Sequence, residues 1–230
     1  MNQRFDFEQA WQAKFVQCLD QVAGPEIRDV VMEGSENLST ETDPLDVIQW
    51  TRGAMDRLVK HVDEAGLKSI MTGCACQYPK SDLQDVRWEF EAKEDIRSVH
   101  RMLQMKFEHF LKETLRLDEE LITEIIDRGW GLAGVIQGET IIATKIPKSG
   151  YLVEYLEETD PEKKRQIYCH CPRVREALAL SQTLPSSYCY CGAGFYKGIW
   201  EEIIQKPVEV EVLESVLSGG EVCRFAIHIT

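Results

Sequence analysis

The chain has 230 residues, of which 43% are hydrophobic and 28% are charged, and its formal net charge is −13 at pH 7. This composition is typical of a globular protein with one sizeable core, and no apolar run approaches the roughly 20 residues that a membrane span needs. Phosphate binding requires clustered Lys and Arg. The most basic run, Lys145–Lys148, has only two charges and is interpreted as a strand end, so we expect no nucleic-acid partner.

The first residues lack the apolar core and the small-residue cleavage site of a secretory signal. We therefore expect a cytoplasmic protein without a membrane span. In that reducing compartment, closely spaced cysteines are more often metal ligands or reactive thiols than disulfides.

Apolar residues at helical spacing predict that the first 128 residues form a helical N-terminal part. The first helix is expected to end at Gly24-Pro25, and a later one at Gly66. In chain order, the predicted helices cover residues 6–23, a short segment after residue 25, residues 44–64, a segment from Ser81, and residues 95–115 and 118–128.

The pattern changes after Gly129. Residues 130–136 and 140–146 flank a Gly-containing turn and predict a β-hairpin, and residues 208–217 and 222–229 predict a second antiparallel hairpin. Between them, the sequence predicts a helical turn near residue 160 and helices over residues 172–180 and 194–205. We expect an α+β fold in which the helices of 1–128 pack with the antiparallel sheet of 129–230 in one compact unit.

Six of the eight cysteines occur as three Cys-x-Cys pairs. On an extended backbone, residues i and i+2 point to the same side, about 6.6 Å apart, which side-chain lean reduces to the sulfur–sulfur distance in a tetrahedral zinc site. The remaining two cysteines, Cys18 and Cys223, are interpreted as core residues. The paired cysteines are Cys74 and Cys76, Cys169 and Cys171, and Cys189 and Cys191.

The last two pairs give the leading zinc site. The 17 residues between Cys171 and Cys189 lie within the range that separates the halves of many four-cysteine zinc sites. The predicted ligands are therefore Cys169, Cys171, Cys189 and Cys191, with Cys74 and Cys76 as alternates. An iron–sulfur cluster is the alternative cofactor. His170 is a weaker ligand candidate, because adjacent residues on a strand face opposite sides.

The C-terminal part carries a resemblance. The segment CYCGAGFYKGIWEEIIQKPVEV from Cys189, followed by GGEVCRF at 219–225, resembles the 4-vinyl reductase domain and the L-2-amino-thiazoline-4-carboxylic acid hydrolase family. The resemblance covers roughly the last 40 to 60 residues. One departure is Ser215, where the 4-vinyl reductase domain often has a cysteine. The two earlier cysteine pairs lie outside the shared pattern, which indicates a distinct branch.

The resemblance implies an α+β fold similar to the heme nitric-oxide-binding and Golgi-tethering folds, with a sheet and helices around a small-molecule or lipid pocket. It also implies that Cys189 and Cys223 contribute to a metal or ligand site.

Three functions follow from these patterns. The first is a metal-binding protein, with zinc on cysteine thiolates, that binds or senses a small molecule. The second is a cysteine-dependent hydrolase of a small C–N or C–S substrate, with Cys191 as nucleophile near a helix N-terminus and His170 or His228 as base. The third is an interaction module with redox-sensitive thiols. Whether the protein is an enzyme, and whether it forms a homodimer, stays open.

Overall fold

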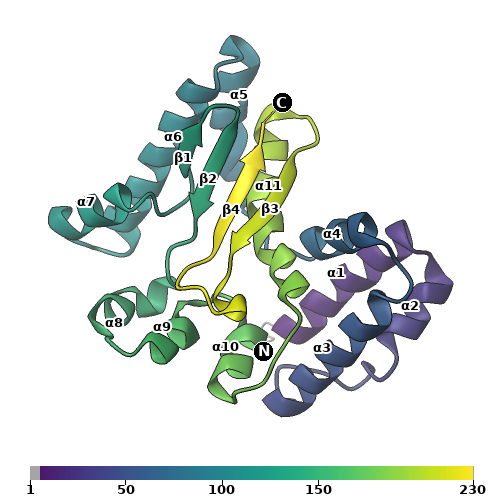
Figure 1. The fold of residues 1–230 in the computed structure, drawn as a ribbon. Helices are drawn as coiled ribbons and strands as arrows, with labels where there is room; N and C mark the ends of the chain where they lie inside the picture. The colour runs from purple at the N-terminus through teal and green to yellow at the C-terminus, as the bar shows by residue number, and fades with distance from the viewer. Residues whose placement is uncertain (1–5, 230) are drawn as a thin grey trace, which may run out of the picture.

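The computed structural model describes residues 6–229. It confirms the predicted α+β class, with helices in the first half and a four-stranded antiparallel sheet formed from the second half (Figure 1). The helices of the first half are α1 (Phe7–Val22), α2 (Pro25–Met32), α3 (Pro44–Leu58), α4 (Glu64–Gly73), α5 (Gln84–Lys93), α6 (Ile96–His109) and α7 (Glu119–Asp127).

The second half alternates short helices with strands. Its helices are α8 (Leu152–Glu157), α9 (Pro161–Tyr168), α10 (Pro172–Ala179) and α11 (Tyr190–Ile204), and its strands are β1 (Val135–Gln137), β2 (Thr140–Thr144), β3 (Glu209–Glu214) and β4 (Arg224–His228). Short helical turns precede α5 (Lys80–Leu83), α8 (Ser149–Tyr151) and α11 (Ser186–Cys189), and one follows β3 (Val216–Ser218), while a π-helical turn (Phe110–Thr114) extends α6.

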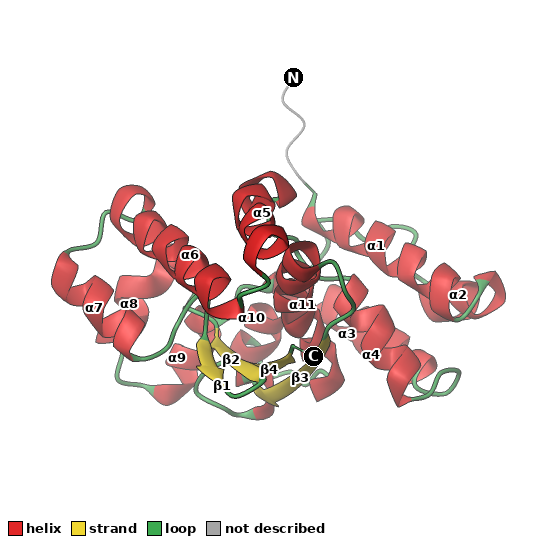
Figure 2. Cartoon of the chain, turned by 90° about the horizontal axis from the view of Figure 1, so that it is seen from above, coloured by secondary structure: helices red, strands yellow, loops and turns green. Residues whose placement is uncertain are grey.

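The two predicted hairpins join into one sheet with the order β1-β2-β4-β3. Ile227 of β4 pairs with Ile141 on one side and with Val210 on the other, which places three buried apolar side chains in one row. Figure 2 shows α5, α6 and α11 on the same side of the sheet. The exposed Glu209 and Glu211 lie on β3, and the alternation along that strand is typical of a sheet with one face in solvent.

Side-chain caps explain most of the helix starts. Asp6, Asp118 and Asp160 each accept a hydrogen bond from a backbone N–H in the first turn of the helix that follows. The prediction that a helix ends at Gly66 is wrong, because an Asp cap starts a new helix there. Helix α3 ends at Leu58, and the Asp63 side chain accepts from Gly66 N, so the chain starts α4 there and Gly66 lies inside it.

The start of the helix predicted over 194–205 also differs. Helix α11 begins at Tyr190, because the turn over Ser186–Cys189 winds directly into it. Helix α8 was not predicted, and β1 is shorter than expected.

Close contact between α11 and α4 brings the two halves of the chain together. A Cβ atom on Gly194 would lie 2.0 Å from the backbone oxygen of Thr72, so only glycine allows this approach. The buried apolar residues of both halves belong to a single cluster.

Candidate functional site

A largely apolar cavity of about 520 Å³ lies between the N-terminal helices and the sheet. Ten of the 26 residues that line it are Phe, Trp or Tyr, and they come from distant parts of the sequence. They include Trp11 of α1, Tyr168 of α9, Tyr188 before α11, Phe195 of α11 and Phe225 of β4. Such a largely apolar wall with a few polar groups is typical of small-molecule sites.

The cavity also collects cysteines. All four predicted zinc ligands line it, together with Cys76 and Cys223. The later two pairs therefore line one cavity, and their sharing of one metal ion stays a prediction. Cys223 was interpreted as a core residue, and it is both 8% exposed and part of the cavity wall.

The pairs do not share one backbone geometry. Cys169 and Cys171 have extended φ and ψ angles, as a Cys-x-Cys chelate requires. Cys189 has helical angles and Cys191 lies in the first turn of α11, so their side chains diverge, because residues i and i+2 do not face each other on a helix. Among the described residues, no three His, Cys, Asp or Glu side chains gather closely enough to hold a metal ion.

The first pair is divided between two environments. Cys76 is exposed and lines the cavity, whereas Cys74 is buried and its thiol donates to the backbone oxygen of Ile70 at 3.2 Å. The Cys74 thiol also lies beside Cys18 of α1, and their hydrogen bond lowers the pKa of Cys18. Cys74 is thus part of a contact between α1 and α4 rather than of the cavity wall.

Burial keeps two of the cavity thiols protonated near pH 7. It raises the pKa of Cys189 and that of Cys191 to about 12, with neighbouring cysteines adding to the effect. The Cys191 thiol donates to the backbone oxygen of Cys74 at 3.6 Å. A nucleophilic thiol requires the opposite shift, so the position of Cys191 near the start of α11 does not activate it.

The two candidate bases have other roles. Nε2 of His170 donates to the backbone oxygen of Ile146 at 2.9 Å, and burial lowers the pKa of His170 to about 4, so the ring is neutral near pH 7. Nδ1 of His228 lies 3.3 Å from the Thr140 hydroxyl, on the sheet and outside the cavity wall. In residues 6–229, neither histidine has a hydrogen bond to Cys191.

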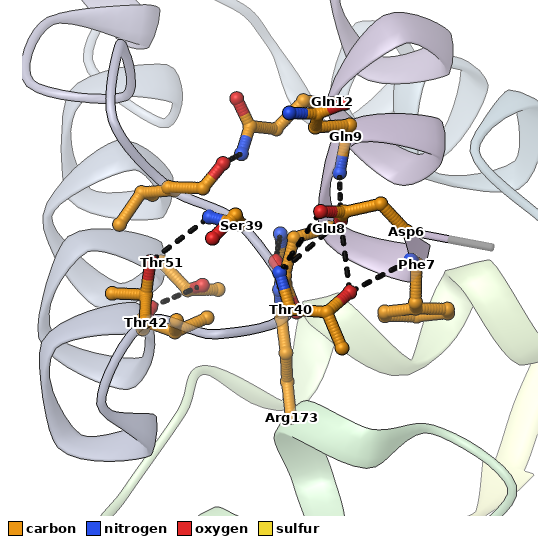
Figure 3. Close-up of polar contacts among 12 residues, drawn as sticks. Asp6, Phe7, Glu8, Gln9, Gln12, Ser39, Thr40, Thr42, Thr51 and Arg173 are labelled. Carbon is orange, nitrogen blue, oxygen red and sulfur yellow. Dashed lines mark hydrogen bonds and ion pairs between the residues drawn. The ribbon is translucent and has the colours of Figure 1, made fainter. Parts of the chain in front are cut away.

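A buried ion pair supports the wall of the cavity from behind. Arg173 of α10 reaches Glu8 of α1, with Nε donating to Oε2 at 2.9 Å, and both side chains are almost fully buried (Figure 3). The guanidinium also lies 3.9 Å from the centroid of the Trp11 ring and donates to the hydroxyl of Tyr188. It therefore holds two aromatic residues of the cavity wall in place.

Sequence reasoning missed the role of Tyr168 and Lys145. The Tyr168 hydroxyl donates to the backbone oxygen of Lys145 at 2.5 Å and accepts from Cys223 N at 2.9 Å, which joins α9 to the ends of β2 and β4. Lys145 was interpreted only as part of a strand end. Its isolation from acidic residues in the sequence was the available signal, but only the fold shows that it lines the cavity.

One family model matches the chain, over residues 156–230, which is roughly a third of its length. It is described as a family of unknown function, DUF6144. The matched segment holds five of the six cavity cysteines. No curated protein and no solved structure matches the chain.

Proposed function

We propose that this protein binds a small, largely apolar molecule in the cavity beside the sheet. The observation that carries the proposal is the cavity itself, because its volume of about 520 Å³ falls within the range of roughly 300–1,000 Å³ found for ligand sites. Its wall combines aromatic rings with cysteine side chains, which are only weakly polar. The resemblance to ligand-binding folds supports the same function.

Binding of a neutral fluorescent probe tests this proposal. N-phenyl-1-naphthylamine is apolar and uncharged, and its fluorescence increases in a dry site. We expect saturable binding to the full chain and a rise in melting temperature with probe concentration, because a ligand that binds only the folded state stabilises it.

A pair of variants locates the bound probe. Ser149 is exposed and lines the cavity, so it lies at the opening, and Ser149→Trp should weaken probe binding at least about 10-fold by obstructing entry. Val153→Trp adds the same ring at an exposed position of α8 that is not part of the wall. It should bind the probe as the unaltered chain does. Equal binding by both variants would contradict the proposal.

Zinc on cysteine thiolates is a second candidate, with an iron–sulfur cluster as its alternative. The specific observation in its favour is the convergence of Cys169, Cys171, Cys189 and Cys191 on one cavity. As described, these thiols are not arranged for coordination, since the pair at the start of α11 diverges. Metal binding therefore requires that this turn unwind.

Elemental analysis after anaerobic purification tests the metal. We expect about one zinc per chain, lost in Cys169→Ser/Cys171→Ser and retained in Cys18→Ser, whose thiol lies outside the cavity wall. A metal-free protein whose cysteines react freely with iodoacetamide, with no change after a chelator is added, would contradict the zinc candidate. A single fast-reacting Cys191 would instead favour the hydrolase.

A further inference from the structure

The charge of the cavity wall is opposite to that of the whole chain. The chain has 39 acidic and 26 basic residues, yet no Asp or Glu is among the described residues that line the cavity. The charged side chains that line it are Lys106 and Lys145. A wall whose charged groups are both cations favours anions over cations.

The two lysines differ in their partners. Nζ of Lys106 forms an ion pair with Asp85 at 2.9 Å, so its charge is already compensated. Within the described part of the chain, Lys145 has no carboxylate within ion-pair distance and no hydrogen-bond acceptor for Nζ. Its ammonium lies 5.0 Å from the centroid of the Phe195 ring, in a half-buried position. A charge in such surroundings is stabilised by an ion of opposite sign.

The backbone of Lys145 is fixed on both sides of the residue. Its N–H donates to the backbone oxygen of Cys223 at 3.0 Å, which continues the pairing of β2 with β4, and its carbonyl accepts from the hydroxyl of Tyr168. Cys223, Tyr168 and Phe195 all line the cavity themselves. The backbone from which the Lys145 side chain extends is therefore fixed at the cavity wall, directly after β2.

Two further cations lie near this end of the cavity. Lys148 and Arg175 both lie over the ring of Tyr151, with Nζ of Lys148 5.3 Å and the guanidinium of Arg175 5.9 Å from its centroid. Among the described residues, neither has a carboxylate within ion-pair distance. Positive charge is therefore concentrated here without a paired carboxylate.

We propose that the ligand is an apolar monocarboxylate, whose carboxylate pairs with Nζ of Lys145 while its aliphatic or aromatic body lies against the aromatic wall. This inference rests on the proposed function and specifies the class of ligand. The carboxylate provides the counter-ion that Lys145 lacks, and the body buries apolar surface in the rest of the cavity.

Competition between a matched acid and alcohol tests the inference. Decanoate and decanol share one aliphatic chain and differ in charge, and each is used to displace N-phenyl-1-naphthylamine from the full chain. We expect decanoate to bind about 10-fold more tightly than decanol, with the difference shrinking as salt is added.

Three variants assign the preference to Lys145. Lys145→Met should remove the preference for decanoate and keep the affinity for decanol and for the neutral probe. Lys145→Arg should keep the preference, since it retains the charge. Lys148→Met removes a nearby cation that is not part of the cavity wall, and it should also keep the preference.

The possible failures are distinguishable. If the neutral probe does not bind the unaltered chain, both the proposed function and this inference are overturned. If the probe binds but decanoate and decanol displace it equally, or if Lys145→Met retains the preference, the inference alone is overturned. If Lys145→Met no longer binds the neutral probe, the competition is repeated with Lys145→Arg, which keeps the charge. Equal displacement of the probe by decanoate and decanol from Lys145→Arg would then overturn the inference.

Discussion

The buried pair of Glu8 and Arg173 is the most demanding contact at the scale of single residues. Burying two charges costs several kcal/mol for each ion, and mutual attraction offsets this cost only when the geometry is good. Arg173 meets this condition with three partners, because it pairs with Glu8, stacks on Trp11 and donates to Tyr188. The pair therefore joins α1 to α10.

Removing one partner of this pair should lower the free energy of unfolding more than removing both partners. Arg173→Leu leaves the Glu8 carboxylate buried without a counter-ion, so we expect a loss of about 3–5 kcal/mol in the free energy of unfolding. Adding Glu8→Leu should recover part of that loss. Urea denaturation measures both values, and Lys112→Ala, in an exposed ion pair with Glu119, should cost less than about 1 kcal/mol. Strictly additive losses for the buried pair would contradict this account.

At the scale of secondary-structure elements, the packing of α11 on α4 depends on one missing methyl group. Because a Cβ at Gly194 would overlap the carbonyl of Thr72, the two helices must separate in Gly194→Ala. We expect a loss of roughly 1–3 kcal/mol in the free energy of unfolding, as for other overpacked sites.

A second glycine of the same helix gives the matched control. No atom lies within 4 Å of a Cβ built on Gly198, so Gly198→Ala should stabilise the chain by about 0.5–1 kcal/mol through better helix propensity. Thermal unfolding of the two variants should therefore shift in opposite directions. A shared direction would show that propensity, rather than the contact with α4, decides the effect.

Elements were predictable from the sequence where their signals were local. Apolar residues at helical spacing, Gly and Pro stops and alternating strands gave the bounds of α1, α7 and the final hairpin to within a few residues. The start of α11 was misplaced because Cys189 and Cys191 were assigned to an extended segment. The sequence contained no local sign that the preceding turn runs into the helix.

The cavity was harder to predict from the sequence than the helices and strands. The cysteine spacing predicted that distant pairs converge, and Cys169, Cys171, Cys189 and Cys191 all line the one cavity. The aromatic wall could not be predicted, because Trp11 and Phe195 repeat at helical spacing and are indistinguishable from ordinary core residues in the sequence. The place of Lys145 at the cavity could not be predicted either, because it depends on the sheet register and on the position of α9, both of which are long-range properties.

At the scale of the whole molecule, the helical and sheet-forming parts share one core. Helix α11 of the second half packs on α4 and α5 of the first, and α10 packs on α3. Within the described residues no helix is both long and apolar enough to cross a membrane. We expect a single cooperative calorimetric transition, with equal calorimetric and van't Hoff enthalpies.

Separate halves test the same expectation. Residues 1–128 and 129–230, expressed alone, should each lack a cooperative transition, because each exposes the apolar surface that the other covers. Mixing the two fragments should restore a transition if they associate. Independent, reversible unfolding of either fragment would show that the chain has two domains.

The contact between Glu8 and Arg173 also sets an order of events during synthesis. The two residues are separated by 165 positions, and ribosomes add about 5–20 residues per second. Helix α1 therefore emerges from the ribosome roughly 10 to 30 seconds before its partner on α10 exists. During that interval Trp11 and Phe15 lack part of the cover that they have in the folded chain, where both are buried.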